Sequence, residues 1–371
     1  MGKIFTAIGL MSGTSLDGID CSIIQSDGEK KLAIIKNLFT KYDSNFREKI
    51  NESIEKINSS KDLERYEKEL AKLEEEITIL HSKTIELILR DSNISKQNID
   101  VVGFHGQTLY HSYKNKITKQ LGNGSLLCQL TKLDTVFNFR KNDIENGGQG
   151  APLTPIYHSL ISQNLNIKNP VVFVNIGGIS NLTYIENEKK IISFDTGPGN
   201  CLIDRYLQIK SNNKIQFDHN GELAFKGNVN QIILENYLND PYYNLLPPKS
   251  LDIKDFNLSS IRGLSLENSI ATLSELTAQT IYNAIIAFEK KPQNIILCGG
   301  GRKNKYIYNR LNILLNKEVI NVDDYNLDGD FIESQAFGYF AIRNLICKPI
   351  TYPETTGVSK PCVAGKLIKF K

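Results

Sequence analysis

One pattern occurs twice in this chain and constrains its fold more than any other feature. An apolar run, a Gly-containing polar turn and a second apolar run form residues 7–24, AIGLMSGTSLDGIDCSII, and the same order recurs in VFVNIGGISNLTYI at residues 172–185. Apolar runs joined by a short turn predict a β-hairpin. The repetition predicts two duplicated α/β domains that face each other across a ligand cleft.

The stretch richest in Gly and Pro is ENGGQGAPLTP at residues 145–155, and it marks the expected domain boundary. We therefore expect an N-terminal α/β domain over residues 1–145 and a C-terminal α/β domain over residues 146–348. The tail, residues 349–371, is expected to pack back on the first domain.

Between these landmarks the chain shows further strand and helix patterns. Three- and four-residue spacing of apolar side chains predicts an amphipathic helix over residues 61–90, whose apolar face packs on a sheet or binds a partner. Strong helices are also expected at 267–290 and 333–346. NIDVVGFHGQT (98–108) predicts a buried strand that ends in a polar turn, and DTVFNFRKND (134–143) a strand that ends in charges.

Composition excludes several classes of protein. The 44 basic and 41 acidic residues leave a formal charge of +3, too balanced for a nucleic-acid-binding or anionic-membrane surface. No apolar run approaches the roughly 20 residues of a membrane span, and the N-terminus is a poor signal peptide. Six widely spaced cysteines without a C-x-x-C pair indicate reduced thiols. We therefore expect a cytoplasmic protein.

Both hairpin turns have the residue types that bind phosphate through the backbone. SGTSLDG lacks the Gly-Lys-Ser/Thr ending of a P-loop, yet its small residues let backbone N–H groups approach phosphate oxygens. The donors in the first turn would be Gly13, Thr14 and Ser15, with Asp17 and Asp20 nearby. In the second turn they would be Gly177, Gly178, Ser180 and Asn181. Tight turns use the same residues, so one turn alone favours a plain hairpin, whereas the two turns together favour phosphate binding.

Two further stretches carry possible chemistry. Gly299, Gly300 and Gly301 follow a strand and would let a flat ring or a phosphate approach the main chain. Asp195, in SFDTGPGN, is placed to act as a general base or to cap a turn.

Three other side chains have both a functional and a structural interpretation. Glu333 opens a helix and either faces a ligand or stabilises the helix dipole. His105 and Arg140 follow strands and either reach a ligand or serve structure. No histidine spacing indicates a zinc site.

These stretches together resemble the anhydro-N-acetylmuramic acid kinase family. The matching motifs run from residue 6 to the TTGVS tail and include GLMSGTSLDGID, GFHGQT, NGGQGAPLTPIYH, VNIGGISNLTYI, FDTGPGNCLID, LCGGGRKN and ESQAFGYFAIR. The resemblance implies the actin, hexokinase and heat-shock-chaperone ATPase superfold, with two duplicated ribonuclease-H-like α/β domains and an interdomain active-site cleft. It also implies ATP-dependent hydrolytic opening of 1,6-anhydro-N-acetylmuramic acid with phosphorylation of O6, in cell-wall recycling.

The resemblance also implies roles for individual residues. Asp195 matches the catalytic base, and His105, Arg140 and Glu333 match sugar-side positions. ATP, with Mg²⁺, would contact the family's nucleotide positions, which here are Gly13, Thr14, Ser15, Leu16, Asp17, Gly18, Ile19, Asp20, Gly177, Gly178, Asn181, Gly299, Gly300 and Gly301. No metal ligand is assigned. The family further implies a homodimer, to which the helix at 61–90 could contribute.

Two segments depart from the family pattern. Lys141 and Asn142 follow Arg140 where the family has further arginines, and LDIK follows PPKS where the family has TGRE. Two alternative functions stay open at this point. An ATP-binding regulatory module of the same superfold would turn over no sugar, and a hydrolase using Asp195 and Glu333 would leave the Gly-rich turns unused.

Overall fold

The computed structural model describes residues 2–371, apart from the side chain of Ile253, and the chain divides into two compact units. Unit 1 runs to Asn164 and also contains Phe331–Lys371, whereas unit 2 is Leu165–Asp330. Compared with the boundaries expected at 145 and 348, residues 146–164 and 331–348 lie with the first unit.

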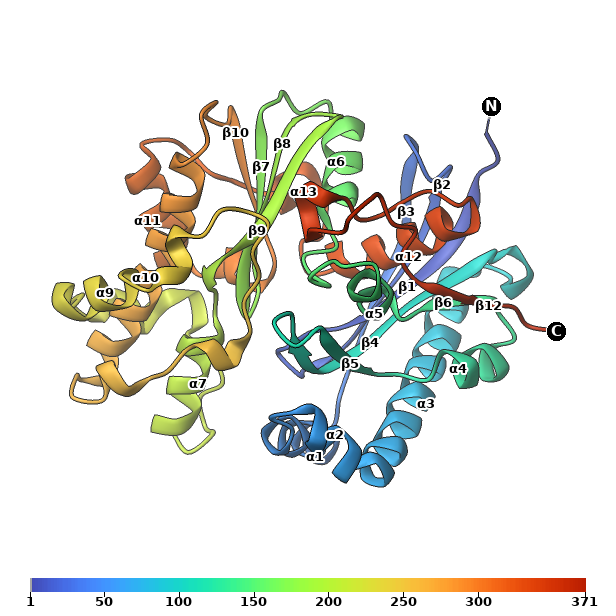
Figure 1. The fold of residues 1–371 in the computed structure, drawn as a ribbon, viewed down its shortest axis with the longest axis horizontal. Coiled ribbons are helices and arrows are strands. Elements are labelled where there is room, and N and C mark those ends of the chain that lie inside the picture. Colours follow the sequence, from blue (N-terminus) through green and yellow to red (C-terminus); the bar gives the residue numbers. More distant parts are fainter. Residues whose placement is uncertain (1) are drawn as a thin grey trace. The chain divides into compact units, whose positions relative to one another are not determined.

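Unit 1 contains a mixed sheet with the strand order β12-β6-β4-β1-β2-β3, and β5 pairs with β4 (Figure 1). β1, β2 and β3 are antiparallel, and β4 and β6 then add in parallel with β1. The strands are β1 (Phe5–Ser12), β2 (Gly18–Ser26), β3 (Leu32–Lys41), β4 (Val101–Ser112), β5 (Ile117–Leu121), β6 (Thr135–Phe137) and β12 (Lys366–Ile368).

Unit 2 contains a sheet with the order β11-β10-β7-β8-β9. β7, β8 and β9 are antiparallel, and β10 and β11 then add in parallel with β7. The strands are β7 (Val171–Ile176), β8 (Ile179–Asn187), β9 (Lys190–Pro198), β10 (Asn294–Cys298) and β11 (Ile320–Asn321). Because β3-β2-β1-β4-β6 and β9-β8-β7-β10-β11 repeat one topology, the prediction of two α/β domains built on one pattern is confirmed.

Helices cover both sheets. Those of unit 1 are α1 (Ser44–Lys56), α2 (Ser60–Arg65), α3 (Glu67–Ser92), α4 (Gly124–Thr131), α5 (Phe139–Glu145), α6 (Pro155–Asn164), α12 (Ile332–Leu345) and α13 (Pro353–Thr356). Those of unit 2 are α7 (Cys201–Lys210), α8 (Glu222–Lys226), α9 (Gln231–Leu238), α10 (Leu266–Ile286) and α11 (Lys305–Leu315). Within residues 2–371 no helix is both long and apolar enough to cross a membrane.

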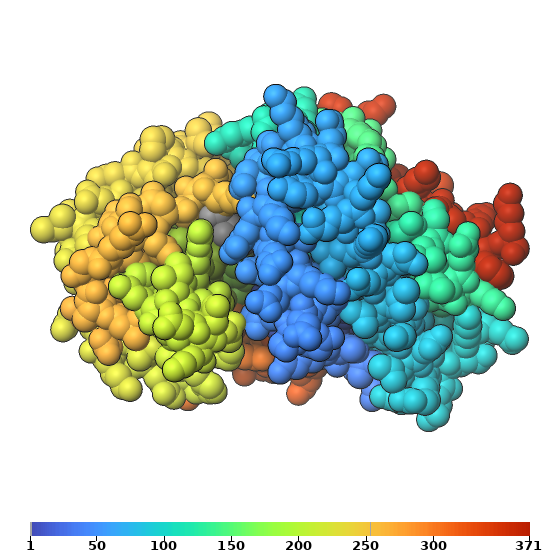
Figure 2. Space-filling view, turned by 90° about the horizontal axis from the view of Figure 1, so that it is seen from below, coloured from blue at the N-terminus to red at the C-terminus, as the bar shows by residue number. Residues whose placement is uncertain are grey.

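The amphipathic pattern at 61–90 forms two helices rather than one, because the chain leaves helical geometry at Tyr66. The longer one, α3, buries Leu70, Leu73, Ile77 and Ile85 in the core of unit 1, against β1 and β2. Its lysines and its glutamates other than Glu74 are exposed, and α1 to α3 form one outer face of this unit (Figure 2). The interpretation of α3 as a helix packed on a sheet is confirmed.

Helix α12 lies with unit 1 because it approaches the sheet at two glycines. A side chain on Gly9 would place its Cβ 1.8 Å from the carbonyl oxygen of Ser334, and one on Gly103 would place it 2.0 Å from that of Phe337. Gly9 and Gly103 are partners in the β1–β4 pairing. The two glycines therefore form a flat site for the α12 backbone, and this contact positions Glu333 in the first turn of α12.

Two sequence predictions about strand ends were wrong. β4 runs through the HGQT segment to Ser112 instead of ending there, because Gly106 adopts a positive φ of 75° where the strand changes partner from β1 to β5. β6 ends at Phe137, and Arg140 lies in α5 rather than at a strand end. The C-terminal strand β12 pairs with β6.

Candidate active site

The turn between β1 and β2 presents an exposed polar backbone. Thr14, Ser15 and Asp17 are exposed, whereas Leu16 turns its side chain into the core and has a positive φ of 55°. The turn is held by side chains from other elements: Gln107 Nε2 donates to the Gly13 carbonyl at 3.1 Å. Arg47 Nη2 donates to the Ser15 carbonyl at 3.2 Å. Of the expected nucleotide-binding residues, Gly18, Ile19 and Asp20 lie in β2 and not in the turn.

A directed chain of hydrogen bonds lies beneath this turn. His81 Nδ1 is 2.8 Å from the Ile77 carbonyl and must donate to it, so its Nε2 accepts from Ser12 Oγ at 3.3 Å. Ser12 Oγ in turn accepts from Tyr42 Oη at 2.7 Å. Burial lowers the pKa of His81 to about 4, so the ring stays neutral near pH 7 and keeps these roles. The chain fixes the end of β1, from which the turn begins.

His105 and Arg140 form a joined pair in unit 1. Arg140 Nε donates to His105 Nε2 at 2.8 Å, and His105 Nδ1 donates to the Gly106 carbonyl at 2.7 Å. Arg140 Nη1 also donates to the Gly150 carbonyl at 2.9 Å. Burial, together with the Arg140 cation, holds the pKa of His105 well below its ordinary value. The histidine is therefore a neutral acceptor that orients the guanidinium.

Glu333 and Asp143 add carboxyl groups to the same region of unit 1. Burial raises the pKa of Glu333 above its ordinary value, and the positive charge of Arg140 opposes this rise. Asp143 is fully buried and accepts from the Gly150 N–H at 2.8 Å and from Thr356 Oγ1 at 2.8 Å. Gly150 is thus held by both Arg140 and Asp143. The three expected sugar-side residues, His105, Arg140 and Glu333, lie in one electrostatically coupled group.

The matching turn of unit 2 is shorter and is held by main-chain atoms. The N–H groups of Gly199 and Cys201 donate to the Gly178 carbonyl at 2.9 and 3.1 Å, and that of Asn200 donates to Gly177 at 2.8 Å. These donors open helix α7. The turn and the start of the helix therefore form one rigid backbone element.

Asp195 lies inside β9, opposite Asn181 of β8, with 5% of its surface exposed. Its Oδ2 accepts from the Leu251 N–H at 2.8 Å. Its N–H donates to the Lys249 carbonyl at 3.0 Å, and its own carbonyl accepts from Tyr242 Oη at 2.5 Å. Helix α7 begins six residues later with Asn200 as its N-cap, so Asp195 does not cap that helix. A buried carboxylate with one oxygen held by a backbone donor has a fixed direction, as a general base requires.

The three glycines after β10 have different roles. Gly299 has a positive φ of 75°, and a Cβ on Gly301 would lie 2.2 Å from the side chain of Ile176. A Cβ on Gly300 would meet nothing within 4 Å. Only Gly300 therefore leaves open space, into which a ligand could fit against the main chain.

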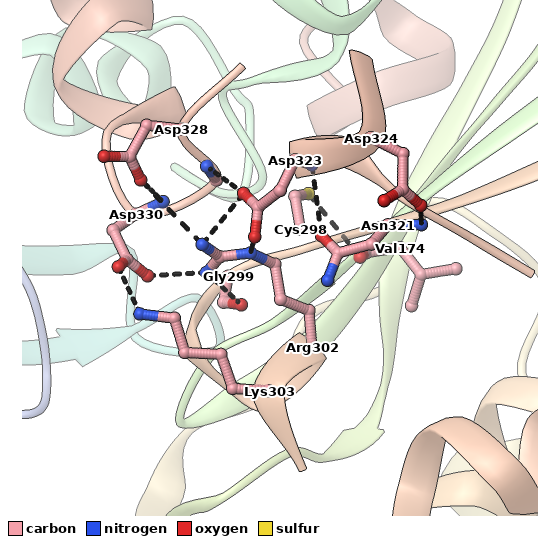
Figure 3. A network of polar contacts seen from close by, with 11 residues as sticks. Val174, Cys298, Gly299, Arg302, Lys303, Asn321, Asp323, Asp324, Asp328 and Asp330 are labelled. Carbon is pink, nitrogen blue, oxygen red and sulfur yellow. Dashed lines mark hydrogen bonds and ion pairs between the residues drawn. The ribbon is translucent and has the colours of Figure 1, made fainter. Parts of the chain in front are cut away.

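Arg302 anchors this glycine turn (Figure 3). The guanidinium donates twice to Asp323, at 3.0 Å each, and also to Asp330 Oδ1 at 2.5 Å and to the Gly299 carbonyl at 3.1 Å. Its side chain is 2% exposed. This bidentate contact between a buried guanidinium and an exposed carboxylate fixes the turn to the segment that ends unit 2.

Several buried polar atoms have no hydrogen-bond partner among the described residues. They include Gln107 Oε1 in unit 1, and Ser180 Oγ, Asn181 Oδ1 and Ser250 Oγ in unit 2. Unsatisfied buried acceptors are costly, and a ligand or an ordered water is the usual explanation. Gln107, Lys249 and Ser250 received no role from sequence reasoning. Gln107 was part of the GFHGQT motif, and the other two were part of PPKS.

A preformed metal centre is not present in the part of the chain that the structure describes, since no three His, Cys, Asp or Glu side chains are grouped to hold one. Asp17, exposed on the first turn, is a single carboxylate beside a phosphate-type turn. Mg²⁺ in nucleotide sites commonly uses one or two carboxylates together with substrate phosphates and water. The donor set therefore fits Mg²⁺ as a companion of a phosphate ligand.

Comparison with known proteins gave a consistent result. The family model described as anhydro-N-acetylmuramic acid kinase matches residues 5–369. The enzyme of that name from Pelagibacter ubique is 43% identical, with all of both chains covered. The one from Brucella canis is 37% identical over 98% of this chain and 99% of the relative. Among solved structures, component A of Acidaminococcus fermentans (R)-2-hydroxyglutaryl-CoA dehydratase aligns with a TM-score of 0.47 and 12% identity, covering 92% of this chain and 99% of the other.

Proposed function

The chain belongs to the anhydro-N-acetylmuramic acid kinase family, and from this premise we propose that it opens the sugar's 1,6-anhydro ring with water while phosphorylating O6. The enzyme is a phosphotransferase that acts on this sugar. The product of the proposed reaction is N-acetylmuramic acid 6-phosphate. ATP is the donor.

The observation that carries the proposal is the setting of Asp195. A buried carboxylate whose Oδ2 is held by the Leu251 N–H has one orientation, so it is suited to take a proton from a single bound water. A residue that only ended a strand would not need its backbone and its side chain bound to the segment 242–251.

The proposed step is balanced in atoms and charge. The water oxygen bonds to C1 and gives one proton to Asp195, while the C1–O6 bond breaks with its electrons moving to O6. O6 then bonds to the γ-phosphorus of ATP, and the bond from that phosphorus to the β-phosphate oxygen breaks to release ADP. Alignment of these groups is worth about 7–11 kcal/mol when geometry is ideal.

On the sugar side we propose that Arg140 and Glu333 bind the substrate and that His105 acts through Arg140. Both ring nitrogens of His105 are engaged within unit 1, which leaves orientation of the guanidinium as its contribution. Burial raises the pKa of Glu333 and the Arg140 cation opposes this rise, and the Glu333 carboxyl is the group we propose to hydrogen-bond the sugar. The expectation of a cleft shared by both domains stays a prediction.

For the nucleotide we propose the backbone of the turns at Gly13–Asp17 and Gly177–Gly178, with Gly300 beside the base or ribose. Mg²⁺ would neutralise phosphate charge, with Asp17 the carboxylate available to it or to its waters. Cell-wall sugar recycling, a cytoplasmic site of action and a homodimer are further proposals that rest on the family alone.

The test is ATP turnover with and without the sugar. ADP release by purified protein is expected only when 1,6-anhydro-N-acetylmuramic acid is present, with a product 98 mass units heavier, the sum of water and a phosphoryl group, about 18 and 80. In H₂¹⁸O, a rapidly quenched product should carry the label at C1 and not on phosphorus.

Two outcomes would contradict the proposal. Equal ADP release with and without sugar would indicate an ATP-binding regulatory module that turns over no sugar. A product heavier only by the phosphoryl group would show that the anhydro ring survives.

A further inference from the structure

The segment from Tyr242 to Leu251 contacts Asp195 through hydrogen bonds from both of its ends. At one end, Tyr242 Oη donates to the Asp195 carbonyl. At the other, the Lys249 carbonyl accepts from the Asp195 N–H and the Leu251 N–H donates to its carboxylate. Asp195 is therefore contacted from both ends of this segment.

The side chain of Lys249 joins those two ends. Its ammonium donates to the Tyr242 carbonyl at 3.1 Å and to the Tyr243 carbonyl at 3.2 Å. It also lies 4.6 Å from the ring centre of Tyr242 and 5.5 Å from that of Phe194, both within cation–π range. A lysine has three donors, so one group can satisfy two successive carbonyls and still face an aromatic ring.

The charge on Lys249 has an unusual environment. The residue is 9% exposed, and its described contacts are with two backbone carbonyls and two aromatic rings rather than with a carboxylate. Burial lowers its pKa, which reflects the cost of keeping this ammonium charged. Buried lysines without a carboxylate are rare because desolvation is not offset by an ion pair. A neutral residue of similar length would avoid this cost but would leave both carbonyls without a donor.

We propose that Lys249 is the positioning residue for Asp195 in the reaction. Its ammonium closes the 242–249 loop and thereby holds the Leu251 N–H against the carboxylate. The inference rests on the proposed role of Asp195 as the base. It assigns Lys249 no contact with substrate, so removing its charge lowers the rate of the chemical step and leaves substrate binding nearly unchanged.

The primary variant is Lys249→Met, which keeps side-chain length and removes the donors. We expect kcat to fall about 10²-fold, the effect of a displacement of roughly 1 Å in a catalytic group. KM for ATP and for the sugar should each stay within about threefold, as for an interaction that matters only in the transition state. Lys214→Met, at an exposed lysine of the same unit, is the matched control and should be indistinguishable from the parent.

A double variant separates positioning from general structural damage. If Lys249 acts through Asp195, then Lys249→Met should cost little further activity in an Asp195→Asn background, measured with radiolabelled ATP. Loss of the same factor in both backgrounds would overturn the proposal. Addition of ethylammonium to Lys249→Ala should restore part of kcat, whereas ethanol at equal concentration should not.

A second route keeps the proposal testable when Lys249 variants fold poorly. Tyr242→Phe removes the hydrogen bond from this segment to the Asp195 carbonyl, and we expect kcat to fall about tenfold with KM unchanged. If Lys249→Met or Tyr242→Phe has the parental kcat, the segment 242–251 does not position Asp195 for the reaction. Full activity of Asp195→Asn would instead refute the proposed base, so the two failures are distinct.

Discussion

The two units share one strand topology but hold their phosphate-type turns in different ways. The first turn, between β1 and β2, is supported by side chains from distant elements, with Gln107 on the Gly13 carbonyl and Arg47 on the Ser15 carbonyl. The second, between β7 and β8, is supported by the start of α7, through main-chain bonds and through Asn200 Nδ2, which donates to the Ile176 carbonyl at 3.4 Å. One sheet pattern can therefore hold its turn through side chains from distant elements or through the start of the next helix.

The third strands of the two sheets differ in a second respect. β9 of unit 2 carries Asp195, which is buried and hydrogen-bonded to the segment 242–251. β3 of unit 1 has neither Asp nor Glu anywhere in its sequence, LAIIKNLFTK. Unit 1 contains the His105, Arg140 and Glu333 group instead. The two units therefore share a strand order but carry their candidate site residues on different elements, Asp195 on β9 of unit 2 and His105, Arg140 and Glu333 on β4, α5 and α12 of unit 1.

The largest expected effect comes from removing the proposed base of unit 2, Asp195. Asp195→Asn should lower kcat by about 10³-fold, within the usual range for general base catalysis, because an amide cannot take the proton from water. Nucleotide affinity, measured by calorimetry, should stay near the parental value. If Asp195→Asn retains parental turnover, unit 2 does not supply the general base through Asp195.

The matched control is another buried acid of unit 2 outside the site. Asp218 accepts from the Leu223 and Ala224 N–H groups and has a raised pKa because of its burial. Asp218→Asn should alter stability and leave kcat per folded molecule within about twofold, since it touches no proposed reacting group.

Acid should destabilise unit 1 more than unit 2. Four of the five histidines lie in unit 1 with a lowered pKa, which burial holds at about 4 for His81 and His111, about 3 for His158 and well below the ordinary value for His105. A depressed histidine pKa gives stability that is complete above 6.5, the unfolded value, and is lost as the pH falls toward the folded value. For His81 alone, the free energy of unfolding is expected to be about 2 kcal/mol lower at pH 5 than above pH 6.5.

Pulse proteolysis in urea at pH 7 and pH 5, with the cut sites mapped, measures this difference. His81→Gln should reduce the loss between the two pH values, whereas His219→Gln in unit 2 should not. Each unit also has two acids whose pKa burial raises, Asp143 and Glu333 in unit 1 and Asp218 and Asp252 in unit 2. Acid stabilises the folded state through these carboxyl groups, and it does so in both units. If both units lose the same stability in acid, the buried histidines of unit 1 are not the cause.

Local patterns were sufficient to predict the hairpins and the long helices. Alternating apolar runs and polar turns marked β1–β2 and β7–β8, and three- and four-residue spacing marked α3 and α10, because these elements depend on burial of one face. Strand β4 was misjudged at Gly106. A glycine at a polar HGQT sequence indicates a turn, yet here it only bends a strand whose pairing continues with β5.

The contacts that complete the site depend on residues far apart in sequence. Lys249 is 54 residues from Asp195, and nothing in PPKS indicates that its ammonium would hold two carbonyls beside that strand. The place of α12 depends on Gly9 and Gly103 meeting its backbone, a contact without a local signal. Family resemblance supplied the candidate site residues, and the structure shows how they are held.

The smallest expected effect distinguishes the glycines of unit 2. Gly300→Ala adds a methyl group where nothing lies within 4 Å, so stability should not change. If nucleotide approaches there, KM for ATP should rise by several-fold, roughly 1 kcal/mol. Gly301→Ala meets Ile176 at 2.2 Å and should instead destabilise the unit by about 1–3 kcal/mol through overpacking.

Gly263→Ala is the control for this last comparison, because its added methyl group would also meet nothing within 4 Å and lies outside the proposed site. Thermal melting and ATP-dependent kinetics of the three variants separate a stability effect from a binding effect. If Gly300→Ala and Gly263→Ala behave alike in both measurements, the open side of Gly300 is plain solvent. The rigid turns of unit 2 would then contact the nucleotide only through Gly177 and Gly178, and adenosine recognition would have to lie elsewhere in the chain.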